Sequence, residues 1–304
     1  MRTGPDYIQF YPTLRCNRAC GFCFNRNMPR TPDMPVEHFR EMVRTITRAG
    51  VRTIDIMGGE PTLHRDLVAC VKEARENGLS VNISSNGSNP GKLAEIMTAF
   101  PEVTVGISVN DRQTLEAMRE FIGRHDPVVK TVFAPAMDWD LIDSLLPKDR
   151  GKYFLIYRDA LDRRELSSTV PFHEFLSTIE KRFEPGRVGM VFCSGFLPDR
   201  DASPELAAVR CPAGTTKLGV MPDGSVYPCN LWFGRKEFFL GNILTDPFET
   251  IWNNGALAWF RSAPGNACPK TSCELHARCH GGCPAQSVAC GGTLTAPDPR
   301  CVGG

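Results

Sequence analysis

The sequence lacks any stretch that would carry the chain into or across a membrane. The N-terminus of this 304-residue chain has no apolar signal core, and no run approaches the roughly 18 apolar residues of a membrane span. An excess of charge of one sign is also missing, because 35 Lys and Arg stand against 34 Asp and Glu and the basic residues are scattered. This balance argues against nucleic acid or another polyanion as a partner. We therefore expect a cytoplasmic protein with no membrane and no nucleic-acid partner.

Cysteine is nearly absent from the middle of the chain and frequent at both ends. Of 13 cysteines, three lie by residue 23, only Cys70 lies between there and residue 192, and nine follow from Cys193 onward. Disulfides are rare in the cytoplasm, so metal binding is the expected use of these thiols. The distribution predicts two cluster-bearing regions that are joined by a thiol-poor body.

Three of the cysteines form a short motif near the N-terminus. Cys16, Cys20 and Cys23 have C-x3-C-x2-C spacing and directly follow the alternating apolar run 7–14, which predicts a strand. Three thiols on one loop cannot all pair as disulfides. Thiolates are the natural ligands of a [4Fe–4S] cluster, and three ligands for four irons leave one iron open to a substrate or cofactor. A zinc loop or three unrelated core thiols is the alternative.

Strands and helices alternate through the first two thirds of the chain. Alternation with helices of 10–15 residues predicts a parallel sheet wrapped by helices. Six strand–helix pairs rather than eight favour a partial TIM-like barrel over an ordinary doubly wound sheet, which would not explain the cysteine loop. Functional residues of such folds lie at the C-terminal strand ends. After the first strand, the predicted strands are 52–57, 80–84, 103–108, 128–133 and 153–157, and the helices are 36–49, 64–77, 91–99, 111–124, 138–146 and 171–183.

The character of the sequence changes near residue 190. Helical periodicity fades, and Pro, Gly and Cys become more frequent. Asp223-Gly224 between two short apolar runs is a strong hairpin signal. We predict a domain boundary at 185–195, which gives a barrel domain at 1–190 and a small cysteine-rich domain at 191–304.

The cysteine loop resembles the signature of the radical S-adenosylmethionine (SAM) enzymes, C-x3-C-x-aromatic-C, in which Phe22 fills the aromatic position. Gly58-Gly59-Glu60-Pro61, after the second predicted strand, matches the G-G-E-P motif of that family. The resemblance implies a (β/α)6 partial barrel and a [4Fe–4S] cluster whose open iron binds SAM. It also implies a flavodoxin- or ferredoxin-type electron donor. Reductive cleavage of SAM would then yield a 5′-deoxyadenosyl radical that abstracts a hydrogen atom from a substrate C–H.

The same resemblance implies a SAM pocket at the strand ends. The two glycines would let the backbone approach the methionyl part of SAM, and Glu60 would receive its ammonium group. The alternative for the polar residues is ordinary turn chemistry or, for arginine, a solvated side chain. By analogy with the family, the further SAM contacts are Ser84, Ser85, Asn86, Ser108 and Arg158, with the last of these reaching either SAM or the substrate.

The C-terminal cysteines resemble the SPASM domain, the auxiliary-cluster extension of many radical SAM enzymes. Cys211, Gly224-x4-Cys229 and a final Cys301 flank the run Cys268-x4-Cys273-x5-Cys279-x3-Cys283. The departure is x4 where the family has x2 after Cys268, and zinc in part of this domain stays an alternative.

Carried over position by position, the SPASM pattern assigns ligands to one or two auxiliary [4Fe–4S] clusters. The second cluster would take Cys268, Cys273, Cys279 and Cys301. The first would take Cys211, Cys229 and Cys283, with Cys193 as our choice for the fourth ligand; without it the cluster is three-coordinate, as in twitch-type relatives. Cys70 is expected to be a small buried hydrophobe. Cys290 is a candidate catalytic hydrogen-atom donor.

We expect a radical SAM oxidoreductase or epimerase, because a non-catalytic cluster carrier would have no use for the Gly-Gly-Glu motif. Two features favour a small carbohydrate-like, aminoglycoside-type natural-product intermediate as the substrate. The first strand starts at residue 7 with no preceding module to grip a leader peptide, and the fourth strand continues as Ser108-Val-Asn-Asp-Arg rather than in the D-G, H-D-x-x-R style of peptide maturases. The expected reaction is epimerisation or dehydrogenation. The alternative is a maturase that crosslinks, epimerises or oxidises a ribosomal precursor peptide.

Overall fold

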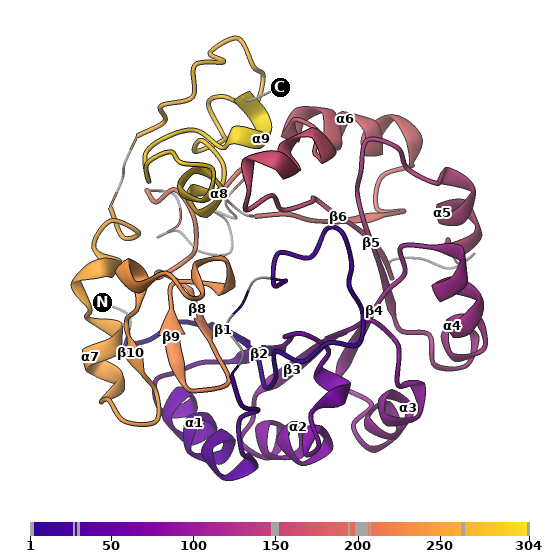
Figure 1. The fold of residues 1–304 in the computed structure, drawn as a ribbon, viewed down its shortest axis with the longest axis vertical. Coiled ribbons are helices and arrows are strands. Elements are labelled where there is room, and N and C mark those ends of the chain that lie inside the picture. Colours follow the sequence, from indigo (N-terminus) through magenta and orange to yellow (C-terminus); the bar gives the residue numbers. More distant parts are fainter. Residues whose placement is uncertain are drawn as a thin grey trace. The chain divides into compact units, whose positions relative to one another are not determined.

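The chain packs as two compact units, which are described separately. The computed structural model describes residues 3–26, 28, 31–146, 152–193, 195–197, 206, 208–262 and 265–302. Unit 1 comprises Met1–Val109, Gln113–Val128 and Ala213–Ala258, and unit 2 comprises Asn110–Arg112, Val129–Pro212 and Trp259–Gly304. The expected α/β class is confirmed, because parallel strands alternate with helices as in a partial TIM-type barrel (Figure 1). The boundary near residue 190 stays a prediction.

Unit 1 is built on a sheet with the strand order β10-β9-β8-β1-β2-β3-β4. Strand β8 pairs in parallel with β1, with Lys217 opposite Tyr7, and β1 pairs on its other side with β2. Parallel pairing continues through β3 and β4, whereas β9 and β10 are antiparallel. A segment from the cysteine-rich part of the sequence therefore extends the first sheet. The strands are β1 (Tyr7–Phe10), β2 (Thr53–Ile56), β3 (Ser80–Ser85), β4 (Thr104–Ser108), β8 (Lys217–Val220), β9 (Ser225–Tyr227) and β10 (Gly241–Asn242).

Helices of unit 1 cover the outer side of this sheet, as α1, α2 and α3 do along β1 to β3 in Figure 1. The apolar face that the sequence predicts for the first helix is buried, and the ring of Phe39 lies 5.2 Å from that of Phe10 on β1. Alternation in β1 turns Ile8 and Phe10 into this core. The elements are α1 (Val36–Arg48), α2 (Leu67–Glu76), α3 (Pro90–Ala99), α4 (Arg112–His125), α7 (Phe248–Trp252) and the 3₁₀ turns η1 (Pro61–Leu63), η4 (Asn230–Trp232), η5 (Lys236–Phe238) and η6 (Gly255–Leu257).

Unit 2 combines three parallel strands with the C-terminal segment that begins at Trp259. Strand β5 pairs with β6, and β6 pairs with β7. An aromatic core lies beside them, in which Phe172 stacks on Phe196 at 4.1 Å and Tyr157 contacts both rings. The elements are β5 (Val128–Val132), β6 (Tyr153–Ile156), β7 (Gly189–Val191), α5 (Trp139–Leu145), α6 (Phe172–Arg182), α8 (Pro284–Ala289), α9 (Pro299–Val302) and the 3₁₀ turn η2 (Arg163–Ser168).

The predicted hairpin at Asp223-Gly224 is present. Strands β8 and β9 run antiparallel with Val220 opposite Val226. Gly224 has φ +85°, and a Cβ there would lie 2.5 Å from the side-chain oxygen of Asn242. Only glycine fits this turn without strain.

The helices in the described ranges are too short and too polar to cross a membrane. The longest of them, α4, has 14 residues. At about 1.5 Å per residue it falls well short of the roughly 30 Å hydrocarbon layer. The cytoplasmic location stays a prediction.

Candidate metal centres

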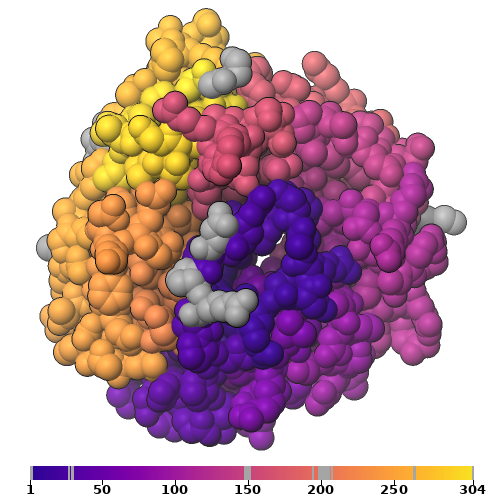
Figure 2. Space-filling view, in the orientation of Figure 1, coloured from indigo at the N-terminus to yellow at the C-terminus, as the bar shows by residue number. Residues whose placement is uncertain are grey.

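The first candidate centre is the loop that leaves the C-terminal end of β1 in unit 1. Cys16 is exposed, whereas Cys20 and Cys23 are half-buried and joined by a hydrogen bond from Cys23 N to Cys20 O of 3.1 Å. Burial raises the pKa of the Cys23 thiol. The indigo N-terminal segment reaches the surface on the face shown in Figure 2. The three thiols thus lie on one accessible loop at a strand end, as predicted.

Gly58 and Gly59 hold the base of this loop by direct backbone contact. Gly59 N donates to Thr13 O at 3.0 Å, and Glu60 N donates to Arg15 O at 2.7 Å. A Cβ on Gly59 would lie 2.2 Å from Arg15 O, and one on Gly58, at φ +126°, would lie 2.4 Å from Thr13 O. Residues 58–60 can therefore pair with 13–15, directly before Cys16, only because no side chain intervenes.

The Glu60 carboxylate is 0% exposed and accepts four hydrogen bonds inside the protein. Oε1 accepts from Thr62 N at 3.0 Å, from Thr62 Oγ1 at 2.7 Å and from Ser85 Oγ at 2.7 Å, and Oε2 accepts from Asn86 N at 2.6 Å. The carboxylate thus ties the loop after β2 to the end of β3. Its predicted contact with the SAM ammonium group stays a prediction, and the structure shows that this carboxylate already has four donors.

Asn86 brings the end of β3 to the cysteine loop. Its Nδ2 lies 3.7 Å from Cys16 Sγ and donates to Asn17 Oδ1 at 3.0 Å. Because the Glu60 carboxylate accepts a hydrogen bond from Asn86 N, it also helps to position the Asn86 side-chain amide beside Cys16.

The other predicted SAM contacts lie at strand ends, and their role stays a prediction. Pro61 is buried at the start of η1 and Ser85 is buried at the end of β3, whereas Phe22, Ser84 and Ser108 are half-buried. Arg158 follows β6 in unit 2, where its carbonyl accepts from Arg300 Nη1 at 2.8 Å.

A clamp that the sequence did not reveal also shapes the cysteine loop. Arg15 Nε donates to Asp33 Oδ1 at 3.1 Å, Thr13 Oγ1 donates to the same oxygen at 2.6 Å, and Arg15 Nη2 reaches Leu63 O at 2.6 Å. Burial alone would raise the pKa of Asp33, but hydrogen bonds from Arg15 and Thr13 hold it below its usual value. No local pattern signals this pair, because Asp33 lies 18 positions after Arg15.

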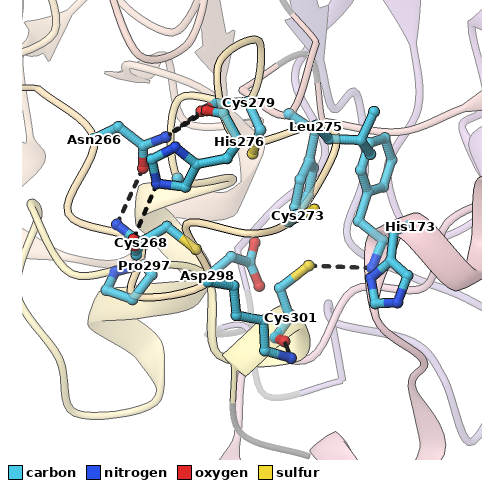
Figure 3. A pocket seen from close by; sticks show the side chains of 14 residues that line it. His173, Asn266, Cys268, Cys273, Leu275, His276, Cys279, Pro297, Asp298 and Cys301 are labelled. Carbon is cyan, nitrogen blue, oxygen red and sulfur yellow. Dashed lines mark hydrogen bonds between the residues drawn. The ribbon is translucent and has the colours of Figure 1, made fainter.

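The second candidate centre is a small cavity in unit 2. Cys268, Cys273, Cys279 and Cys301 all line it, and Figure 3 shows these four side chains around the same space. These are the four residues that the SPASM resemblance assigns to the second auxiliary cluster. The structure therefore gathers the whole predicted donor set, including the two cysteines separated by the unusual x4 spacing.

Backbone and side-chain hydrogen bonds fix the segments that carry these thiols. Asn266 accepts from Cys268 N at 3.1 Å and donates to the carbonyls of His276 and Cys279 at 2.9 and 2.6 Å (Figure 3). The Cys301 thiol accepts a hydrogen bond of 3.1 Å from Phe172 N, and burial raises its pKa to about 11. Amide donors to ligand sulfurs are a feature of iron–sulfur sites.

Asn266→Ala is expected to weaken iron binding at this cavity. The substitution removes three hydrogen bonds that hold two ligand-bearing segments, each worth about 1 kcal/mol. Iron and sulfide content after anaerobic reconstitution should fall by part of one cluster, and the melting temperature of the loaded protein should drop. Asn253→Ala, at another exposed asparagine, is the control. Full iron retention in the Asn266 variant would contradict this role.

The cysteines assigned to the first auxiliary cluster are divided between the units. In unit 2, Cys193 and Cys283 are hydrogen-bonded to each other, and this bond, together with burial, raises the pKa of Cys283. Cys211 is buried in the same unit. A Cβ on Gly195 would lie 2.7 Å from Gly282 O, so the Cys193 and Cys283 segments are packed backbone to backbone. Cys229 is buried in unit 1, after β9.

The described donor side chains do not converge on a single metal ion. Within the described ranges, no three Cys, His, Asp or Glu side chains lie close enough to hold one ion. A single zinc with Zn–S bonds of about 2.3 Å needs its sulfurs within roughly 4 Å of one another, whereas a [4Fe–4S] cluster binds each thiolate on a different iron. All 13 cysteines are described, and no disulfide joins any of them.

The two remaining cysteines are buried. Cys70 lies in the apolar face of α2, as expected, and burial raises its pKa to about 12. Cys290, at the end of α8, is 5% exposed and its thiol faces Ala160 O at 3.7 Å. It does not line the cavity of the four cysteines. Its role as hydrogen-atom donor stays a prediction.

Two family models match the chain. Residues 10–133 match the model of the radical SAM superfamily, and residues 211–284 match SPASM, an iron–sulfur cluster-binding domain. The first range runs from Phe10, the last residue of β1, to Phe133 and includes the cysteine loop. The second contains Cys211, Cys229, Cys268, Cys273, Cys279 and Cys283.

Individual proteins are similar over nearly the whole chain. The mycofactocin maturase MftC of Mycobacterium ulcerans is 29% identical over 99% of this chain and 88% of its own length. The PqqA peptide cyclase of Xanthomonas euvesicatoria pv. vesicatoria is 25% identical over 95% of this chain and 85% of its own length. In structure, Streptococcus suis SuiB bound to S-adenosylmethionine aligns with a TM-score of 0.74 and 18% identity, covering 98% of this chain and 77% of SuiB.

Proposed function

Because this chain is a radical SAM enzyme with a C-terminal SPASM iron–sulfur domain, we propose that it oxidises a ribosomally made peptide. Its cofactors are a SAM-binding [4Fe–4S] cluster and auxiliary iron–sulfur clusters. When bound and reduced, the first of these would give one electron to SAM and so cleave it to methionine and a 5′-deoxyadenosyl radical, which would take a hydrogen atom from a substrate C–H. Removal of one further electron and a proton from the substrate then completes a two-electron oxidation, such as a crosslink or a desaturation.

The peptide class rests on the relatives that match over nearly the whole chain. One is by name a maturase and another a peptide cyclase. These relatives favour the peptide over the carbohydrate-like substrate that the early first strand and the Ser108-Val-Asn-Asp-Arg segment led us to expect. That segment follows β4, and differences between loops at this position are compatible with one shared chemistry.

The cavity with four cysteines in unit 2 is the observation that supports oxidation as the reaction outcome. A site with a full thiolate set suits a cluster that stores an electron rather than one that binds substrate. Epimerisation needs a hydrogen-atom donor that reaches the substrate radical, and the one candidate thiol, Cys290, is buried against Ala160. Gln286, 0% exposed, helps to keep it there, because its side chain bonds Ala160 N at 2.9 Å and Asp159 Oδ1 at 2.8 Å.

The residues of unit 1 serve to present the SAM-binding loop. Gly58 and Gly59 pair with residues 13–15, Glu60 holds the end of β3, and Asn86 contacts the loop at Cys16. A small flavodoxin or ferredoxin as electron donor is part of the proposal, since reductive cleavage of SAM consumes one electron.

The proposal is tested by coexpression with each short open reading frame that lies beside the gene. We expect one encoded peptide to lose two hydrogens, with one 5′-deoxyadenosine formed per modified peptide. The Cys290→Ala variant should give the same product, as should the control Cys70→Ala. A peptide of unchanged mass that gains deuterium from heavy water, together with loss of that product in Cys290→Ala, would show epimerisation instead. Turnover of an aminoglycoside-type sugar but of no peptide would refute the peptide class.

A further inference from the structure

Arg210 is a buried cation whose side chain bonds only to backbone carbonyls. It is 2% exposed. Nε donates to Gly282 O at 3.0 Å, Nη1 donates to Leu294 O at 2.8 Å, and Nη2 donates to Ala296 O at 2.7 Å and also to Gly281 O. The guanidinium therefore joins the chain before Cys283 to the segment 294–296.

The charge of the Asp298 carboxylate acts on this guanidinium, but the two groups are not joined as an ion pair. Among the described residues, no Asp or Glu oxygen forms an ion pair with Arg210. The nearby Asp298 is bonded instead by Arg300 Nη2 at 2.8 Å and by Cys283 N at 2.9 Å. Arginine stays protonated in proteins, and a buried charge without a counter-charge is strongly unfavourable. Because Asp298 is already paired with Arg300, the burial of Arg210 calls for a further negative group beside it.

Three cysteines lie near this cation, either next to it in the chain or next to a segment that contacts it. Cys211 is the next residue in the chain, and Cys283 follows the carbonyl that accepts from Nε. A Cβ on Gly195, two residues after Cys193, would lie 2.7 Å from Gly282 O and 3.2 Å from Arg210 O. Cys283, Cys211 and Cys193 are all among the groups whose charge acts on the guanidinium. They are also the cysteines of unit 2 that were assigned to the first auxiliary cluster.

We propose that Arg210 is the counter-ion of the first auxiliary cluster, a positioning residue that holds the Cys283 segment and raises the reduction potential of that cluster. The inference rests on the auxiliary cluster of the proposed function but not on the peptide substrate. Ligated cysteines are thiolates, so cluster binding supplies the negative charge that the buried guanidinium requires. A fixed positive charge favours the reduced, more negative cluster, and net charge and hydrogen bonding are among the factors that set iron–sulfur potentials. Acceptance of an electron from the substrate needs such a potential.

The test is a redox titration followed by electron paramagnetic resonance on the reconstituted protein. Cys16, Cys20 and Cys23 are replaced by alanine in every sample, so that only auxiliary clusters contribute to the spectrum. We expect Arg210→Met to make reduction of one auxiliary cluster at least about tenfold less favourable, a downward shift of about 59 mV for a one-electron couple. Arg210→Lys should retain most of the potential because it keeps the charge. Arg182→Gln, at a surface arginine that pairs with Asp143, is the control.

Thermal unfolding of the apo and the loaded protein separates the counter-ion role from a purely structural one. Because Arg210 also holds four backbone carbonyls, Arg210→Met should lower the stability of the apo protein, but a counter-ion predicts a larger loss in the loaded protein and hence a smaller rise in melting temperature on loading. An equal loss of stability in both states, or an unshifted potential with full iron content, would overturn the inference. Absence of iron from the background variant with Arg210 intact would instead refute the auxiliary cluster of the proposed function.

Discussion

Replacing Cys16 by alanine is expected to abolish cleavage of SAM while most of the auxiliary iron stays bound. The [4Fe–4S] cluster proposed for this loop has only three thiolate ligands, and the substitution removes one of them. The Asn86 amide, whose Nδ2 lies 3.7 Å from the Cys16 sulfur, cannot take the place of a thiolate ligand. The effect should therefore be a complete loss of 5′-deoxyadenosine rather than a reduced rate.

The loss should stay local because the two kinds of centre have separate supports. The loop depends on Gly58, Gly59 and the Arg15–Asp33 pair in unit 1. The cavity with four cysteines lies in unit 2 and depends on Asn266 and Phe172 N. Iron and sulfide analysis of the reconstituted variant, together with a 5′-deoxyadenosine assay under reducing conditions, measures both parts. Cys70→Ala is the matched control, since it removes a buried thiol of α2.

Either of two results would count against this prediction. Retained cleavage of SAM in Cys16→Ala would end the assignment of the loop as the radical centre. Loss of all iron would mean that the auxiliary centres depend on the loop for their folding, contrary to the separate contacts described above.

Glu60→Ala is expected to have the second large effect, as a loss of both stability and the first cluster. The substitution leaves the amide donors of Thr62 and Asn86 buried without their acceptor, and leaves the hydroxyls of Thr62 and Ser85 to find others. Each buried donor left unpaired is unfavourable by about 1–3 kcal/mol. A total of roughly 3–5 kcal/mol is a large share of the 5–15 kcal/mol that typically separates folded from unfolded protein. Denaturant unfolding monitored by circular dichroism measures it.

Glu60→Gln separates this structural role from contact with SAM. Glutamine keeps one acceptor oxygen for Thr62 and Ser85 but turns an amide donor toward Asn86 N, so stability without SAM should fall, by less than in Glu60→Ala. If the carboxylate instead receives the SAM ammonium, Glu60→Gln should be stable without SAM and should raise the KM for SAM. Glu116→Gln, at an exposed pair with Arg119, should change little and is the control.

The spacing of residues along the sequence predicted the helices, the strands and the cysteine motif that indicates an iron–sulfur cluster. Cys16, Cys20 and Cys23 belong to one loop whatever the rest of the chain does, and the buried face of α1 follows from a repeat of 3.6 residues. The hairpin at Asp223-Gly224 is likewise a property of two adjacent residues. Local spacing did not decide between a carbohydrate-like substrate, which we expected, and a peptide, which was the alternative, because substrate choice depends on loops that no local pattern describes.

Only the tertiary structure decided which distant residues meet. The pairing of β8 with β1, the burial of Glu60 under the end of β3, and the four carbonyls around Arg210 join positions 25 to more than 200 residues apart. Each arises because a buried polar group must find a partner wherever the packed backbone provides one. The spacing of residues along one sequence does not show which distant groups will meet. The ligand cysteines could therefore be proposed from the sequence alone, whereas the groups that position them and balance their charge could not.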